Sequence, residues 1–317
     1  MISILLAALA GSALPADAEA TCIDAGPTMH AVADALRSRY VIIDKGAEAA
    51  TRIEQRVASG QFDRICGAPD ERARTLTTGL RFLLPDQHLR IAAGAPQDPD
   101  PPAEAPQDAL EYGLGIGEVS RLPGGIGYLR IAAWLPVEWV RPRLESALDL
   151  LRGSKAIIID VRGNGGGDGN TMNLVARSFL PAGAPQTLVG MDRSGAPHDY
   201  IEPAEPAWVR FASDLPLAVI IDGDSASASE ALAFILQQEK RATIVGRRSA
   251  GAAYAVMDAV VLPGDFALYL PEYRGVSRYD GSDWEGGGVV PDVWAGAGEE
   301  KLTAWEVLRA ATAPDTD

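Results

Sequence analysis

The stretch Leu217-Ala-Val-Ile-Ile-Asp-Gly-Asp-Ser-Ala-Ser-Ala-Ser-Glu-Ala-Leu-Ala-Phe-Ile-Leu236 decides the fold. Residues 217–221 are all apolar and predict a strand, and residues 231–236 predict part of a helix. The turn between them can present a serine Oγ at the carboxyl end of a sheet, where a helix N-terminus offers unpaired N–H groups and a partial positive charge to an oxyanion. Ser and Asp are also ordinary helix caps, so this stretch alone leaves a nucleophile and a structural cap both open.

Short apolar strands alternate with helices through the second half of the chain. Strands are predicted at 126–131, 156–161, 217–221 and 242–245, and helices at 137–151, 170–179 and 229–238. This order indicates an α/β fold with a mostly parallel sheet, covered by helices through right-handed crossovers. The remaining expected elements are strands at 259–262 and 266–270, joined as a hairpin, and a closing helix at 302–311.

The first part of the chain has a different pattern. Apolar residues recur at helical spacing over 27–86, which predicts a small helical unit. Residues 92–109 are rich in Pro, Ala and acids and predict a solvated linker or surface loop. The expected domains are a leader at 1–20, a helical N-terminal domain at 21–91, a Pro/acid-rich linker at 92–118 and a larger domain at 119–317.

Composition excludes several classes of partner. With 317 residues, 47% of them hydrophobic, the chain can bury one large core or two modest ones. Its 28 basic and 43 acidic residues leave a formal net charge of −15. Such a charge argues against nucleic acid and against an anionic membrane surface, because both attract basic proteins. A peptide or small-molecule substrate fits better.

The N-terminal residues are typical of a secretory signal. An apolar run over 2–10 is followed by Gly11, Pro15 and small residues that offer cleavage sites, although no Lys or Arg precedes the run. The run is too short for a stable membrane anchor, so we expect a periplasmic or secreted protein with no anchor after cleavage. The alternative is a buried N-terminal helix or strand.

The chain has two cysteines, Cys22 and Cys66. In an oxidising compartment they could pair and hold the new N-terminus to the first domain. The alternative is two buried thiols that never meet, because sequence separation does not fix the distance between them.

Three further stretches carry candidate chemistry. The glycine-rich run 160–170 follows a strand and could hold an anion or serve as a flexible turn, and its spacing fits neither a dinucleotide fingerprint nor a phosphate loop. His88 follows a Pro-Asp break and could act as a base, or it could be a packed residue; the other histidines, 30 and 198, are expected at the surface. Glu285 could steady an imidazolium, or it could be a solvated loop carboxylate.

Together these stretches resemble the serine peptidase family of C-terminal processing peptidases and the tricorn core peptidase, in the branch close to interphotoreceptor retinoid-binding protein. The resemblance covers residues 36–295. Its motifs are Tyr40-Val-Ile-Ile-Asp-Lys45, Asp86-Gln-His-Leu89, Gly127-Tyr-Leu-Arg-Ile131, Asp160-Val-Arg-Gly-Asn-Gly-Gly-Gly167, Ser225-Ala-Ser-Ala-Ser-Glu230, Ile244-Val-Gly246 and Glu285-Gly-Gly-Gly-Val-Val-Pro-Asp292. It implies a crotonase-like ββα superhelix for 119–317, acting as a serine peptidase on a peptide or protein substrate with no cofactor or metal.

The resemblance also implies roles for single residues. Ser227 would be the nucleophile, and the backbone N–H of Ala228 with that of a glycine in 165–167, taken as Gly166, would form the oxyanion hole. Processing peptidases of this family use a Ser-Lys dyad, but the lysine position here is Ala252, which cannot accept a proton. The tricorn-type arrangement takes a histidine and a glutamate instead.

His88 and Glu285 occupy the positions of that histidine and glutamate. Where this branch has a serine that relays between them, the present chain has Gln87, whose amide can both donate and accept hydrogen bonds. A PDZ domain would be inserted within 89–125, a segment too short for one, so none is expected. Two alternatives to a peptidase are a catalytically silent module that binds an apolar ligand or peptide in the same cleft, and a crotonase-like acyl-CoA enzyme.

Overall fold

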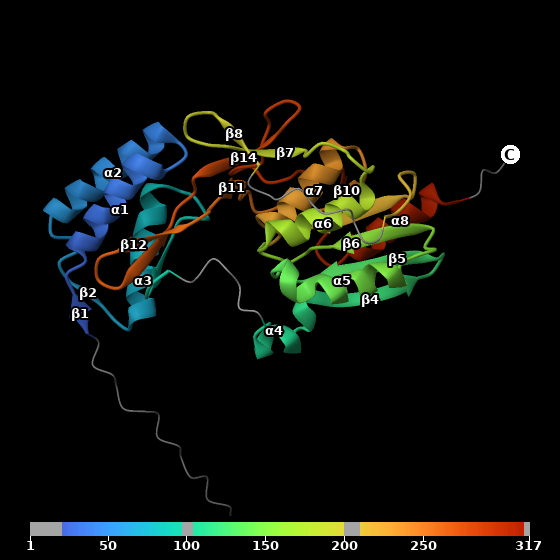
Figure 1. Cartoon of the computed structure of the whole chain (residues 1–317), viewed down its shortest axis with the longest axis horizontal. Helices are drawn as coiled ribbons and strands as arrows, with labels where there is room; N and C mark the ends of the chain where they lie inside the picture. Colours follow the sequence, from blue (N-terminus) through green and yellow to red (C-terminus); the bar gives the residue numbers. More distant parts are fainter. Residues whose placement is uncertain (1–20, 97–103, 200–209, 314–317) are drawn as a thin grey trace, which may run out of the picture.

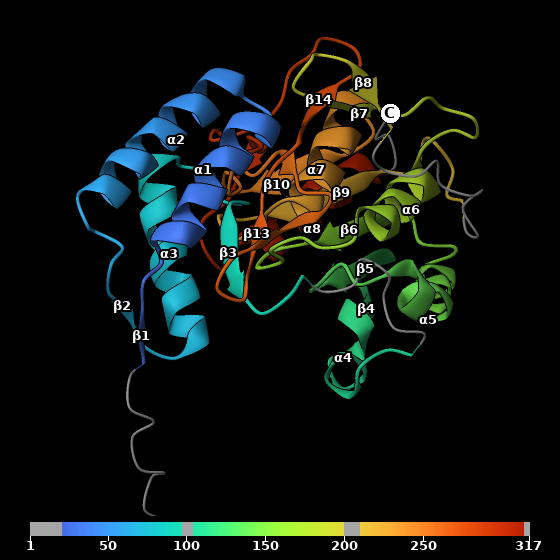
Figure 2. The ribbon, with the colours of Figure 1, turned by 60° about the vertical axis from the view of Figure 1, so that its left-hand side comes forward.

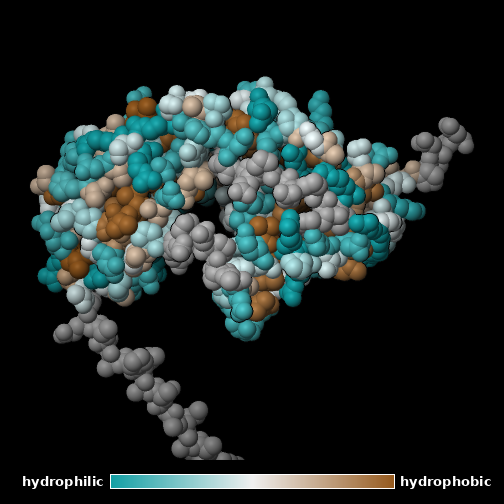
Figure 3. Space-filling model, in the orientation of Figure 1, coloured by the Kyte–Doolittle hydropathy of each residue, from teal (hydrophilic) through white to brown (hydrophobic). Residues whose placement is uncertain are grey.

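The computed structural model describes residues 21–96, 104–199 and 210–313 (Figure 1). The expected leader at 1–20 lies outside the described residues. In the part of the chain that is described, no helix has the length and apolar character needed to cross a membrane. The face shown in Figure 3 is mostly hydrophilic, with apolar residues in scattered groups.

A six-stranded sheet forms the centre of the larger part. Its order is β15 (Val293–Trp294), β10 (Thr243–Gly246), β9 (Leu217–Ile221), β6 (Ala156–Asp160), β5 (Ile126–Ile131) and β4 (Ile116–Leu122). The pairings from β15 to β5 are parallel, and β4 runs antiparallel to β5 at one edge. The mostly parallel α/β sheet predicted from the sequence is therefore present, and the strands predicted at 126–131 and 217–221 have those bounds.

Helices cover both faces of this sheet. The helices are α5 (Val137–Leu150), α6 (Gly169–Phe179), α7 (Ala228–Gln238) and α8 (Glu300–Ala311). Side chains alternate along each strand, so that Ile157 and Ile159 of β6 join α5, α6 and α7 in one core cluster. Ile158 faces the other way and packs in a smaller cluster with Leu308 of α8. Because every residue of β6 and β9 is buried, the uninterrupted apolar runs in their sequences are explained.

The N-terminal helices form a second core. They are α1 (Gly26–Arg39), α2 (Ile43–Ala58) and α3 (Pro69–Leu83), which confirms the helical pattern over 27–86. This core is completed by a three-stranded sheet of order β12 (Ala259–Leu262), β13 (Phe266–Tyr269) and β3 (Arg90–Ala93). Phe266 and Leu268 of the predicted hairpin are buried with Leu80 of α3. The hairpin from late in the chain thus lies beside the N-terminal helices, as Figures 1 and 2 show.

A third, antiparallel sheet lies between these two parts (Figure 1). Its order is β11 (Tyr254–Ala255), β14 (Tyr273–Ser277), β7 (Leu188–Met191) and β8 (Pro197–His198). The expected linker over 92–118 differs from the structure where it is described, because β3 ends at Ala93, a short helix α4 spans Gln107–Glu111, a 3₁₀ turn spans Gly113–Gly115, and β4 begins at Ile116. The segment at 97–103 lies outside the described residues.

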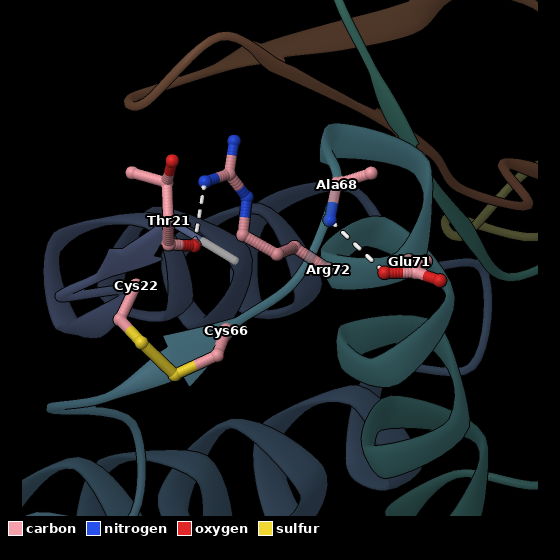
Figure 4. The surroundings of a disulfide bond; sticks show 6 residues. All are labelled: Thr21, Cys22, Cys66, Ala68, Glu71 and Arg72. Carbon is pink, nitrogen blue, oxygen red and sulfur yellow. Dashed lines mark hydrogen bonds between the residues drawn. A yellow bond between two sulfur atoms is a disulfide. The ribbon is translucent and has the colours of Figure 1, made fainter. Parts of the chain in front are cut away.

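The two cysteines are joined by a disulfide in the structure. They lie opposite each other in a small antiparallel pair, β1 (Cys22–Ile23) and β2 (Ile65–Cys66). Figure 4 shows the bond beside the first turn of α3, where Arg72 Nη1 donates to Thr21 O at 3.2 Å and the amide of Ala68 donates to Glu71 Oε2 at 3.0 Å. The start of the described chain is thereby fastened to the N-terminal helices.

Candidate active site

The turn between β9 and α7 is held by one carboxylate. Asp222 Oδ1 accepts hydrogen bonds from the amides of Asp224 and Ser225, each at 3.1 Å, and from the amide of Gly163 at 3.0 Å. Ser227 then adopts φ +53° and ψ −116° directly before α7. A positive φ is strained for a residue with a Cβ, and such strain persists only where surrounding contacts enforce it. The turn therefore displays the Ser227 hydroxyl at the N-terminus of α7.

A second carboxylate fixes the nucleophile candidate to the neighbouring loop. Glu230 is fully buried. Its oxygens accept from the Ser227 amide at 2.8 Å, the Gly251 amide at 2.6 Å, the Ala252 amide at 2.8 Å and Ser249 Oγ at 2.6 Å. These bonds satisfy the buried charge with donors from two segments. Ala252, where the sequence resemblance would place the lysine of the processing peptidases, contributes to this network through its main chain.

The side chain of His88, which comes from the N-terminal part of the chain, lies next to the Ser227 hydroxyl. Its Nε2 lies 3.3 Å from Ser227 Oγ. Its backbone N–H donates to Asp86 Oδ1 at 2.9 Å, so the two residues form a tight turn after α3. Burial lowers the pKa of the His88 imidazole below its ordinary value, and the negative charges of Asp86 and Glu230 oppose this change. A buried imidazole with a lowered pKa is neutral near pH 7 and can accept a proton.

Asp86 is the acid that lies beside the imidazole. Its Oδ1 is 3.9 Å from His88 Nδ1, which is buried and has no hydrogen-bond partner among the described residues. Its Oδ2 accepts from the Tyr40 hydroxyl at 2.9 Å, and Asp86 itself is 3% exposed. Burial, together with the charge of Asp86, raises the pKa of the Tyr40 hydroxyl, which keeps it protonated as a donor. The contacts hold the Asp86 carboxylate in place next to the ring.

Glu285 and Gln87 have other partners. Glu285 Oε2 accepts from the amides of Ala253 at 2.7 Å and Tyr254 at 3.2 Å, and burial raises the pKa of this carboxyl to about 7. Gln87 Nε2 donates to the carbonyl of Ala250 at 2.9 Å. In the described parts of the chain no hydrogen bond joins either side chain to His88. Glu285 instead lines a separate cavity of about 420 Å³ beside Tyr40, between α2 and the loop at 283–286.

The glycine-rich loop after β6 lies against Ser227. A Cβ on Gly166, whose φ is +106°, would approach Ser227 Cβ to 2.7 Å, so only glycine fits there. The Gly166 amide, however, already donates to Asn164 Oδ1 at 3.0 Å. The amides of Gly167 and Ala228 have no acceptor within the described chain, and both residues line the cleft that contains Ser227. Two unpaired N–H groups are therefore available near the hydroxyl.

The cleft around Ser227 and His88 has a volume of about 470 Å³. Part of its wall is apolar or small, formed by Met172, Ala228, Ala231, Ala252, Ala253, Ala255, Val256, Met257 and Trp284. One side is β11, which is an edge strand among the described residues and pairs there with β14. Within the residues that the structure describes, no group of three or more His, Cys, Asp or Glu side chains is arranged to hold a metal ion.

Three of these residues were not singled out from the sequence. The sequence indicates Asp86 only as part of a Pro-Asp break and of a motif, and it indicates Tyr40 and Glu230 only as parts of motifs. A usable signal for Asp86 is its spacing, because an Asp two residues before a loop His can accept a hydrogen bond from the backbone N–H of that His in an Asx turn. Buried Glu230 lies at the N3 position of α7, which is the usual place for a capping-box acid.

Comparison with known proteins assigns the chain to a family. Residues 125–295 match the model of peptidase family S41. The chain belongs to peptidase family S41. The resemblance drawn from the sequence motifs is thereby confirmed at the level of the family.

A curated relative within this family is the carboxyl-terminal-processing protease of Synechocystis sp. (strain ATCC 27184 / PCC 6803 / Kazusa). It is 31% identical over 185 residues, which are 55% of this chain and 38% of that protein. The match therefore spans well under half of the relative's length.

Two solved structures show the same fold. The photosystem II D1 C-terminal processing protease has a TM-score of 0.58 and 16% identity, covering 92% of this chain and 97% of that one. The tricorn protease has a TM-score of 0.59 and 13% identity, covering 90% of this chain and 37% of the larger tricorn chain. Both likenesses concern the fold alone, and they extend over the N-terminal helices as well as the α/β part.

Proposed function

We propose that this S41 family member is a serine-type peptidase in which Ser227 attacks a peptide carbonyl and His88 accepts the hydroxyl proton. The observation that carries the proposal is the 3.3 Å separation between His88 Nε2 and Ser227 Oγ. A nucleophile and its base must lie within hydrogen-bond reach, and apo structures often have slightly long distances. The position of Ser227 at the start of α7 also brings the N–H of Ala228, unpaired within the described chain, beside the reacting atom.

The proposed reaction follows the general path of serine acyl transfer. Ser227 Oγ bonds to the carbonyl carbon while its proton moves to His88 Nε2, and the carbonyl oxygen becomes an oxyanion. The carbon–nitrogen bond then breaks, and the leaving amine takes the proton from His88. Water, deprotonated by His88, attacks the acyl-enzyme, and collapse of the second intermediate releases the new carboxylate and restores the Ser227 hydroxyl.

The oxyanion would be held by two backbone amides. We take Ala228, the residue that the sequence resemblance implies, as one of them. For the second donor the contacts favour Gly167 over Gly166, because the Gly166 N–H is bonded to Asn164 whereas Gly167 lines the cleft. Donors that are already in place before reaction stabilise the developing charge without reorganisation.

The proposed acid partner of His88 is Asp86. The sequence motif suggested Glu285 acting through Gln87, but both of these side chains bond to the main chain of the 250–254 segment. Asp86 is buried and lies within 4 Å of His88 Nδ1. A carboxylate at this distance stabilises the imidazolium that forms when Ser227 loses its proton.

The proposed location is the periplasm or the exterior of the cell. The disulfide between Cys22 and Cys66 supports this, since such bonds persist mainly in oxidising compartments. Fractionation of the producing cells, followed by immunodetection of the mature chain, tests the location. Recovery of the full-length chain in the cytosol would contradict it.

The activity is tested by incubating the purified protein with an unfolded model protein and with a fluorophosphonate probe. We expect peptide fragments and a covalent label, both absent in Ser227→Ala and both retained in Ser146→Ala, which alters an exposed serine of α5. If the wild-type protein is folded by circular dichroism yet gives neither fragments nor label, the proposal fails and a silent binding module is favoured.

A further inference from the structure

One acidic side chain stands out in the cleft that contains Ser227 and His88. Among the described residues that line it, Asp168 is the only acid, and no Lys or Arg is present. The other lining residues are the histidine and neutral side chains, most of them small or apolar. A bound apolar peptide would remove water from this carboxylate and leave the charge unpaired, which is energetically unfavourable. The carboxylate therefore affects which peptides the cleft can bind.

The contacts of Asp168 leave its charge without a protein counterion. Its Oδ1 accepts from the Thr171 amide at 2.6 Å and caps α6, while its own amide donates to Trp134 O at 2.8 Å. No Lys, Arg or His nitrogen of the described chain lies within 4 Å of the carboxylate. Glu138 at the start of α5 adds a second negative charge nearby, and burial together with Glu138 raises the Asp168 pKa.

Helix capping alone does not require this charge. Asn caps a helix about as well as Asp, because one side-chain oxygen is enough to accept the N2 or N3 amide. The negative charge at position 168 is favoured by the positive end of α6, and it is at the same time part of the cleft wall. A bound ammonium or guanidinium group would form an ion pair with Asp168 and would also be attracted by the negative charge of Glu138. The formal charge of −15 on the whole chain also attracts basic peptides.

We propose that Asp168 makes the cleft selective for peptides that carry a Lys or Arg side chain close to the scissile bond. This specificity rests on the proposed peptidase function of the same cleft. The cationic group would lie at the N-terminal end of α6, against Asp168, while the main chain of the peptide passes between the glycine-rich loop and β11. A free peptide α-amino group has the same chemistry and is separated from a side-chain cation in the experiment below.

The test measures binding rather than cleavage, so that it does not depend on turnover. Fluorescent, C-amidated octapeptides of Ala and Val are prepared with Lys at each position in turn, and a matched set carries norleucine. Their affinities for the full-length Ser227→Ala protein are measured by fluorescence anisotropy. The same sets are measured with Ser227→Ala/Asp168→Asn, which keeps the cap. The control is Ser227→Ala/Asp224→Asn, which removes an equal charge at an exposed residue outside the cleft.

At one or two positions Lys is expected to bind about fivefold more tightly than norleucine, which is the size of effect for a partly exposed ion pair. This preference should disappear in the Asp168→Asn protein, persist in the Asp224→Asn control and weaken in high salt. Equal binding of the two sets, or a Lys preference unchanged by Asp168→Asn, would overturn the proposal. Each set is also measured after N-acetylation. If N-acetylation weakens the Lys and norleucine peptides equally, and does so only in the protein that keeps Asp168, the α-amino group is the ligand and the proposal is overturned. Failure of the peptidase proposal is recognised separately, by absence of probe labelling at Ser227.

Discussion

The imidazole Nε2 of His88 lies 3.3 Å from the hydroxyl of Ser227, although 139 residues separate them in the chain. Ser227 belongs to the α/β part, whereas His88 follows the last N-terminal helix. Leu89, next to His88, is buried in the N-terminal core with Phe266 and Leu268 of the late hairpin. The hairpin thus joins the two parts, and its packing sets the position of the imidazole over the serine.

The pH dependence of hydrolysis should follow the lowered pKa of His88. The imidazole must be neutral to accept a proton, so activity is lost as the pH falls through its pKa. Because burial lowers that pKa, the acidic limb of kcat/KM is expected to have its midpoint below 6.5, the ordinary histidine value. Initial rates measured from about pH 4 to about pH 8 locate this midpoint. A midpoint above 6.5 would show that the imidazolium is stabilised in the free protein.

Substitution of the two candidate acids should separate their roles. Asp86→Asn removes the charge beside the imidazole and is expected to lower kcat by about 10²-fold or more. It should also move the acidic limb further down, since Asp86 raises the pKa of His88. Glu285→Gln, which alters a side chain bonded to Ala253 and Tyr254, is expected to leave kcat within about threefold of the wild type. The reverse ranking in steady-state kinetics would restore Glu285 as the orienting acid.

Glu285 should instead affect how stability depends on pH. Its folded-state pKa of about 7 is above the ordinary value of 4.5, so the protonated form is favoured by folding. The stabilisation is fully present below pH 4.5 and is lost as the pH rises through 7. Because the side chain is partly exposed, we expect this contribution to the free energy of unfolding to be about 1 kcal/mol. Urea unfolding of wild type and Glu285→Gln at both ends of that window measures it, and a stability difference that does not vary with pH would contradict the assignment.

The disulfide should stabilise the N-terminal part. The bond between Cys22 and Cys66 closes a loop with a sequence separation of 44 residues. Closing a loop of this size lowers the conformational entropy of the unfolded chain and thereby stabilises the folded state by up to about 4 kcal/mol. We expect Cys22→Ser/Cys66→Ser to lower the free energy of unfolding by about 2 to 4 kcal/mol without loss of Ser227 labelling in the folded protein. An unchanged urea midpoint would show that the bond has little effect on stability.

The strands of the main sheet were predictable as apolar runs, and the helices that cover it were predictable from apolar residues at helical spacing. The strands at 126–131 and 217–221 and the hairpin strand at 259–262 have the predicted bounds. The sheet of β7, β8, β11 and β14 was missed because its strands are short and partly exposed. The packing of the hairpin on α3 could not be predicted from the sequence either, because a local apolar pattern does not show which distant surface a hairpin covers.

The candidate site was predictable to a similar degree. Motif residues such as Ser227 and His88 carry their signal in the neighbouring sequence. The partner of the imidazole does not, because the choice between Asp86 and Glu285 depends on where two loops converge. Likewise, nothing in the sequence of the glycine-rich run shows that the Gly166 amide is taken by Asn164.

The most direct test of the central claim, that the His88 imidazole activates the Ser227 hydroxyl, is the rate of Ser227 modification by a fluorophosphonate in wild type and in His88→Gln. Mass spectrometry of the labelled peptide identifies the modified serine. We expect labelling at Ser227 with a second-order rate constant that falls by about 10²-fold or more in His88→Gln. Equal rates in the two proteins, or a label on a different serine, would contradict the account.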